Sequence, residues 1–201
     1  MKIKRVGVLG SAFNPPHLGH KDILNQVNHE FDELLLVPSF RHAFAKTMVP
    51  FADRLAMVSI MAQAYYLEAT MHNRSLTPVL VSDIERRLGE KTNSPVYTYH
   101  VLEALEDCYK RAGEMVELVF ILGPDNVSFD TWSKFYKADE IRKRWSLRSV
   151  SERIKIHSSD IRTLIANYPR PEKLFKARFN RFMDNPVADY IFQQKLYGAQ
   201  K

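Results

Sequence analysis

The chain has 201 residues, of which 45% are hydrophobic and 26% charged, a composition that suits one globular domain with a full core. A single cysteine, Cys108, excludes an internal disulfide framework and a zinc site built from several cysteines. The net charge of +6 favours anionic partners, a class that includes nucleic acid, acidic membranes and phosphorylated small molecules.

Short apolar runs alternate with stretches of helical periodicity along the chain. The pattern predicts strands at 6–9, 34–37, 79–81, 116–122 and 153–156, and a short helix followed by a strand within 141–150. It predicts longer helices at 18–28, 51–66, 97–109, 159–166 and 185–197. This alternation is typical of a three-layer α/β fold with a parallel sheet.

Targeting signals are not evident in the sequence. No apolar run approaches the roughly 20 residues that span a bilayer. The basic residues of Met1–Arg5 resemble the start of a signal peptide, but the apolar stretch after them ends within a few residues at Gly10-Ser11. We therefore expect a cytoplasmic protein that does not bind a membrane.

In parallel α/β sheets, ligands bind beyond the carboxyl ends of the strands. We therefore expect one edge of the sheet to bring together the segments 10–20, 38–46, 82–98, 123–132 and 157–162. The whole chain, 1–201, is expected to form a single domain. Its last part, from about 157 to 201, is expected to be helical.

The segment with the most chemical information follows the first predicted strand and reads Gly10-Ser11-Ala12-Phe13-Asn14-Pro15-Pro16-His17-Leu18-Gly19-His20. Small residues at 10–12 let backbone N–H groups approach a phosphate. His17 and His20 stand three apart at a helix start, where free N–H groups and the helix dipole favour anions. Imidazoles in that position can donate hydrogen bonds to phosphate oxygens without a metal. Neither a Rossmann glycine fingerprint nor a Walker A loop is present.

This segment resembles the His-x-Gly-His signature of a nucleotidyltransferase superfamily. Within that superfamily, the chain is most similar to bacterial nicotinate (or nicotinamide) mononucleotide adenylyltransferases. Further segments resemble the family in the same order, namely Val37-Pro38-Ser39 with Lys46, Phe51–Met57, Asp83–Arg86 with Tyr97-Thr98, Ile121–Asp125 with Trp132, and Ile156–Arg162. The resemblance covers nearly the whole chain and implies a three-layer, Rossmann-like nucleotidyltransferase fold and a role in NAD biosynthesis.

The resemblance implies transfer of the adenylyl group of ATP to nicotinate or nicotinamide mononucleotide, by direct in-line displacement of pyrophosphate. Such a reaction needs positioning and positive potential more than proton transfer. The catalytic residues implied are His17, His20, Lys46 and Arg162. Those implied for ATP binding are Gly10, Ser11, Ala12, Phe13, His17, Gly19, His20, Gly123, Asp125, Ser158, Ser159 and Arg162. Those implied for the pyridine nucleotide are Asn14, Ser39, Lys46, Arg54, Tyr97, Thr98 and Trp132.

Magnesium is the cofactor that the family implies, carried mainly by ATP, so no set of protein ligands is expected for it. The expected partners are ATP and a pyridine mononucleotide. Nucleic acid is not expected, because the basic residues are scattered apart from the locally dense stretches 142–148 and 173–181. Oligomeric state is not readable from the sequence, and a homo-oligomer is one of the states it allows.

The chain departs from the family pattern at three places. Asn14 stands where the family usually has Asp, His157 stands where it usually has Ser, and the stretch between Trp132 and Ile156 is shorter than in the family. These departures keep two alternatives open. One is a nucleotidyltransferase of the same superfamily with another phosphorylated acceptor, and the other is a diverged paralogue that binds a nucleotide without turnover.

Overall fold

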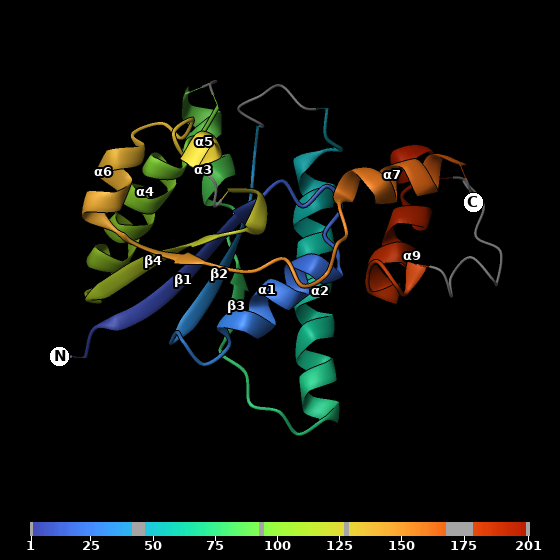
Figure 1. The fold of residues 1–201 in the computed structure, drawn as a ribbon, viewed down its shortest axis with the longest axis horizontal. Coiled ribbons are helices and arrows are strands. Elements are labelled where there is room, and N and C mark those ends of the chain that lie inside the picture. Colours follow the sequence, from blue (N-terminus) through green and yellow to red (C-terminus); the bar gives the residue numbers. More distant parts are fainter. Residues whose placement is uncertain (1, 42–46, 93–94, 127–128, 168–178, 200–201) are drawn as a thin grey trace.

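The computed structural model describes residues 2–41, 47–92, 95–126, 129–167 and 179–199. At its centre is a five-stranded parallel sheet of order β3-β2-β1-β4-β5 (Figure 1). The strands are β1 Lys4–Ser11, β2 Glu33–Pro38, β3 Val79–Val81, β4 Val116–Leu122 and β5 Ser146–Ser149. Strand β2 lies on one side of β1 and β4 on the other. The strand order therefore reverses at β1, which places the usual ligand crevice beyond the carboxyl ends of β1 and β4.

Helices cover both faces of the sheet, because alternate side chains of each strand enter different cores. In β4, Val119 and Ile121 belong to one core, and Leu118 and Phe120 to the other. The first core contains α1 (Leu18–Val27), α2 (Phe51–Met71), α7 (Ser158–Asn167) and α9 (Asn185–Gln193). The second contains α3 (Ile84–Thr92), α4 (Thr98–Arg111), α5 (Phe129–Trp132) and α6 (Ala138–Arg144). The three-layer α/β fold expected from the sequence is confirmed.

The elements differ from the sequence-based expectation in several places. The prediction of a strand at 153–156 was wrong, because β5 ends at Ser149 and the chain then leaves the sheet, with Arg153 and Lys155 exposed. Helix α3 was not predicted, and α2 continues as far as Met71. The last predicted helix ends earlier, at Gln193, and Lys195 after it adopts a left-handed conformation with a φ of 55°.

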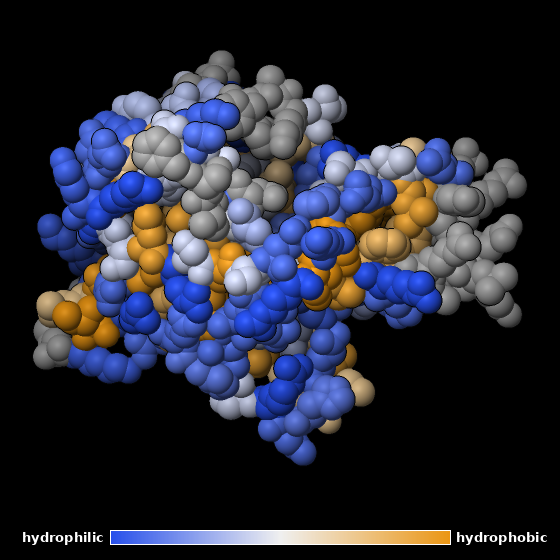
Figure 2. Space-filling view, in the orientation of Figure 1, coloured by the Kyte–Doolittle hydropathy of each residue, from blue (hydrophilic) through white to orange (hydrophobic). Residues whose placement is uncertain are grey.

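The surface is mainly hydrophilic on the face shown in Figure 2, and its apolar side chains form separate patches. Of the helices that the structure describes, none is both long enough and apolar enough to cross a membrane.

Candidate nucleotide site

His17 is the N-cap residue of α1, and its side chain has a fixed tautomer. The Nδ1 atom accepts a hydrogen bond from the backbone N–H of Gly19, at 3.2 Å. A neutral imidazole whose Nδ1 accepts carries its proton on Nε2. Burial, together with the smaller effect of the nearby His157, lowers the pKa of His17 to about 4. At neutral pH, His17 is therefore an uncharged Nε2–H donor.

His20 lies beside His17 and has the same tautomer. Its Nδ1 accepts the backbone N–H of His17 at 3.2 Å, which completes a reciprocal capping box. Its Nε2 lies 3.2 Å from the hydroxyl oxygen of Ser11, at the carboxyl end of β1. The centroids of the two imidazole rings are 3.9 Å apart, and burial holds the pKa of His20 well below its usual value. Two neutral imidazoles are therefore in contact, with their planes tilted by 44°, where β1 ends and α1 begins.

The start of α1 offers these imidazole donors in place of free backbone N–H groups. The N–H of Leu18 donates to the carbonyl oxygen of Phe182 at 2.8 Å, and that of Gly19 is taken by His17. The sequence-based expectation of free N–H groups at this helix start was wrong, because the chain itself pairs them. An anion here would meet side-chain donors.

The three glycines of the site differ in how much space surrounds them. A Cβ on Gly19 would lie 2.9 Å from the Nδ1 and Cε1 atoms of His17, so only glycine leaves room for the ring. A Cβ on Gly10 or Gly123 would meet nothing closer than 3.8 Å. The protein's own packing therefore does not demand glycine at 10 or 123, where the small residues leave space at the strand ends.

Helix α7 brings the second signature against the first. Ser158 Oγ donates to the carbonyl oxygen of Pro15 at 2.8 Å, and Arg162 Nη1 donates to that of Asn14 at 2.7 Å. Ser159 is exposed in the first turn of α7, and the backbone N–H groups of Ser158 and Ser159 have no partner among the described residues, whereas that of Asp160 donates to the carbonyl oxygen of His157. The start of α7 is thus a second set of donors facing the same loop.

Asn14 and Arg54 hold loops together in this structure. The Asn14 side chain is 5% exposed, and its Oδ1 accepts from the N–H of Val49 and from the hydroxyl of Tyr197. The Arg54 side chain is 1% exposed and donates to the carbonyl oxygens of Val49, Ala12, Ser39 and Phe40. Direct contact of Asn14, Ser39 or Arg54 with a pyridine nucleotide stays a prediction.

Trp132 lies inside the second core rather than at an open surface. It is 2% exposed, and its ring stacks on Phe135 with the centroids 4.9 Å apart. The Arg142 guanidinium lies 5.2 Å from its centroid, and the indole N–H has no hydrogen-bond partner among the described residues. Stacking of a pyridine ring on Trp132 stays a prediction, and it requires Phe135 or Arg142 to move.

Tyr97 and Thr98 form the start of α4. Tyr97 is 39% exposed and stacks on Tyr136, and its side chain makes no cap hydrogen bond. In the first turn of α4, the N–H of His100 donates to the carbonyl oxygen of Tyr97 at 2.9 Å, whereas the N–H groups of Thr98 and Tyr99 have no partner among the described residues. They are suitable donors for a carboxylate.

Some predicted site residues cannot be placed. Lys46 and the side chain of Asp125 lie outside the described residues. Ala12 contributes its carbonyl oxygen to Arg54, and Phe13 is fully buried with its ring 4.6 Å from that of His20. Both residues therefore contact other residues of the site, Arg54 and His20 respectively.

Two further polar residues near the site had no predicted role. Glu85 is buried, accepts the N–H of Phe40 at 2.8 Å, and has its pKa raised by burial to about 8. Lys21 is 6% exposed on α1. A sequence signal existed for Lys21, because it stands three residues before the buried Leu24 and so lies on the buried face of the helix.

Comparison with known proteins identifies the family of this chain. Residues 8–164 match the model of the cytidylyltransferase-like family. This chain belongs to the cytidylyltransferase-like family. The matched region contains the whole signature segment, the second half of β1, the other four strands and most of α7.

Relatives within the family share a name. A Streptococcus pneumoniae protein named as a probable nicotinate-nucleotide adenylyltransferase is 27% identical over 98% of this chain and 90% of its own length. A crystal structure from Vibrio parahaemolyticus, provisionally assigned the same activity, is 28% identical with a TM-score of 0.74, covering 98% of this chain and 96% of its own. A Plasmodium falciparum nicotinic acid mononucleotide adenylyltransferase complexed with NaAD shares the fold at 15% identity and a TM-score of 0.68, with 96% and 97% covered.

Proposed function

We propose that this protein transfers the adenylyl group of ATP to nicotinate mononucleotide and thereby makes the dinucleotide of NAD biosynthesis. The observation that carries the proposal is the adjacent pair His17 and His20, two neutral Nε2–H donors at the switch point of the sheet. The names of the full-length relatives support this choice of acceptor. A cytoplasmic location, where ATP is available, is part of this proposal.

The reaction is a direct displacement. A phosphate oxygen of the mononucleotide forms a bond to the α-phosphorus of ATP, and the bond from that phosphorus to the bridging oxygen breaks, so that pyrophosphate leaves. Negative charge moves onto the leaving group, and fixed N–H donors stabilise it without having to reorganise. His17 and His20 would hold the α- and β-phosphates, and the first turn of α7 with Arg162 would hold the outer phosphates.

Magnesium is expected to enter with the nucleotide. Within the described residues, no group of three His, Cys, Asp or Glu side chains could hold a metal ion. Such a group is not required when a divalent cation is bound mainly by the phosphates of ATP. The cation would neutralise the charge of the phosphates while the imidazoles orient them.

The acceptor would be read at the start of α4. Its unpaired N–H groups, next to Thr98, are suitable partners for the carboxylate that distinguishes nicotinate from nicotinamide. The ring would stack on an aromatic face, either Trp132 after rearrangement or another ring of this edge.

Pyrophosphate release with ATP and magnesium tests the proposal, with nicotinate mononucleotide and nicotinamide mononucleotide as alternative acceptors. We expect turnover with the nicotinate form, and a His20→Ala variant that is at least about 10²-fold slower. Turnover with neither acceptor would overturn the proposal. A clear preference for the nicotinamide form would correct the acceptor and keep the reaction.

A further inference from the structure

The C-terminal part of the chain makes a set of polar contacts with the signature segment. Five hydrogen bonds join residues 158–197 to residues 14–21, namely Ser158 to Pro15, Arg162 to Asn14, Tyr197 to Asn14, Leu18 to Phe182, and Lys21 to Asp184. All of them reach the loop before α1 or the first turns of that helix. The orientation of α1 therefore depends on the C-terminal part.

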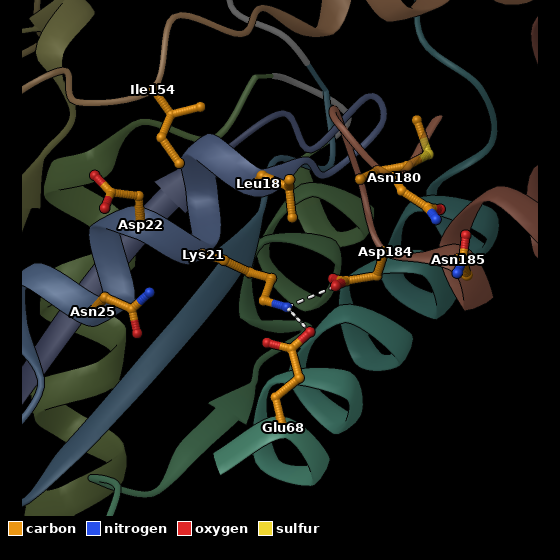
Figure 3. Close-up of a pocket in the computed structure, with 10 residues that line it drawn as sticks. Leu18, Lys21, Asp22, Asn25, Glu68, Ile154, Asn180, Asp184 and Asn185 are labelled. Carbon is orange, nitrogen blue, oxygen red and sulfur yellow. Dashed lines mark hydrogen bonds and ion pairs between the residues drawn. The ribbon is translucent and has the colours of Figure 1, made fainter. Parts of the chain in front are cut away.

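The contact between Lys21 and Asp184 is the ion pair of this set. Its ammonium nitrogen lies 2.6 Å from Oδ1 of Asp184 and 2.8 Å from Oε1 of Glu68 (Figure 3). Asp184 directly precedes α9, and Glu68 lies on α2, so one ammonium joins three elements. Both Lys21 and Asp184 have side chains only 7% exposed. Loss of Lys21 would leave the buried Asp184 without its counter-charge, whereas loss of Asp184 would leave Lys21 paired with Glu68 alone.

An open pocket borders α1 on the side of this ion pair. The face of the helix that carries Leu18, Lys21 and Asn25 borders a cavity of about 390 Å³ (Figure 3). Met183 and Asp184 line the cavity as well. Packed side chains normally fix how a helix is rotated, and Leu24 and Val27 pack in the core on the other side of α1. On the pocket side, the Lys21 ammonium adds a polar contact that connects α1 to Glu68 of α2 and to Asp184.

Rotation of α1 moves both histidines. Lys21 directly follows His20, and the backbone N–H of His17 must reach Nδ1 of His20 to complete the capping box. The Nε2 of His20 must also stay within reach of Ser11 on β1. A misplacement of about 1 Å at a reacting centre can cost about 10²-fold in rate.

We propose that Lys21 is a positioning residue, whose ammonium, shared by Asp184 and Glu68, fixes the rotation of α1 and thereby aims His17 and His20 at the phosphates. The proposal rests on the function proposed above. Through Asp184, the C-terminal part would then contribute to catalysis as well as to the core.

The test compares two lysine variants of the full chain. Lys21→Met removes the ammonium and keeps the length of the side chain. Lys4→Met is the matched control, because Lys4 also contacts two carboxylates, Glu33 and Glu114, but at the start of β1. We expect kcat to fall roughly 10- to 100-fold in Lys21→Met, with the KM of the acceptor within about threefold of wild type, and to stay within about twofold in Lys4→Met.

Two further variants separate positioning from folding. Lys21→Arg keeps the charge beside a cavity that can take the larger head, and we expect it to restore most of kcat. Lys21→Met combined with Asp184→Asn removes the unpaired buried carboxylate, so thermal stability should recover while kcat stays low. Recovery of kcat together with stability would overturn the proposal.

Ring signals of the histidines give a readout that does not need turnover. Proton–nitrogen NMR spectra should show shifted His17 and His20 rings in Lys21→Met and unshifted rings in Lys4→Met. Rings that coincide with wild type in Lys21→Met overturn the positioning role, whatever the activity. A wild-type protein without turnover overturns the proposed function, and the NMR comparison still decides the role of Lys21.

Discussion

The phosphate side and the acceptor side of the candidate site are built differently. On the phosphate side, residues 10–13, 17–20 and 158–162, the predicted side chains lie close together. His17 there keeps an N–H without a fixed protein partner among the described residues. On the acceptor side, Asn14, Arg54 and Trp132 are buried and already engaged by the protein. The phosphate side is therefore preformed, whereas the acceptor side has to rearrange or to use backbone groups.

Replacing His17 gives the largest expected effect. Asparagine is a good N-cap residue, so His17→Asn keeps the helix start and removes only the imidazole. We expect kcat/KM for ATP to fall about 10²- to 10³-fold, because one preorganised donor to the transition state is lost. Steady-state kinetics together with a thermal melt measure this. A fall of less than tenfold in kcat/KM in a folded variant would falsify the statement that the phosphate side is preformed.

Replacing Arg54 should affect folding more than catalysis. Its buried guanidinium donates to four carbonyl oxygens from three segments of the chain. Arg54→Met leaves those oxygens without a charged donor, and we expect a loss of about 3 kcal/mol in the free energy of unfolding. Chemical denaturation measures it. An unchanged stability with a raised KM for the mononucleotide would instead place Arg54 on the substrate.

A methyl group at Gly19 tests how tightly the His17 ring is held. The new Cβ would lie 2.9 Å from the ring, and the imidazole would have to turn away. We expect Gly19→Ala to lower kcat about 10-fold or more while the helix becomes no less stable, since Ala favours helix over Gly. Gly10→Ala is the control for a small residue with space around it, and equal rates for Gly19→Ala and wild type would contradict the fixed ring.

Trp132 tests rearrangement on the acceptor side. If the pyridine ring stacks there, the indole must leave Phe135, and its fluorescence must change on binding. We expect nicotinate mononucleotide, but not an ATP analogue, to quench the fluorescence of a Trp145→Phe variant that keeps Trp132. Quenching by the ATP analogue alone would show that Trp132 does not contact the mononucleotide.

Glu85 gives the smallest expected effect, in the pH dependence of stability. Its folded pKa of about 8 lies above the usual 4.5, because burial outweighs the Phe40 N–H and Arg54. The folded protein thus keeps a proton that the unfolded chain loses, so the free energy of unfolding falls as pH rises from 4.5 to 8. One pKa unit is about 1.4 kcal/mol, and we expect a fall of at least that size between pH 5.5 and 7.5. Denaturation of Glu85→Gln should lack this slope.

The same contrast explains what could be predicted from the sequence. The signature residues His17, Gly19 and His20 are close in the chain, and a local helix start determines their geometry. The engagement of Arg54 depends on loops that come from distant parts of the sequence, which no local pattern encodes. The false strand at 153–156 has a similar cause, since its apolar residues suit a strand but the sheet ends at β5.

The state of the two histidine rings tests the preformed phosphate side most directly. Proton–nitrogen NMR spectra of the histidine rings at neutral pH should show His17 and His20 uncharged, each with its proton on Nε2. Addition of a non-hydrolysable ATP analogue should shift both Nε2–H signals and leave the tautomers unchanged. Rings that are protonated in the free protein, or that do not respond to the nucleotide, would contradict the role assigned to this pair.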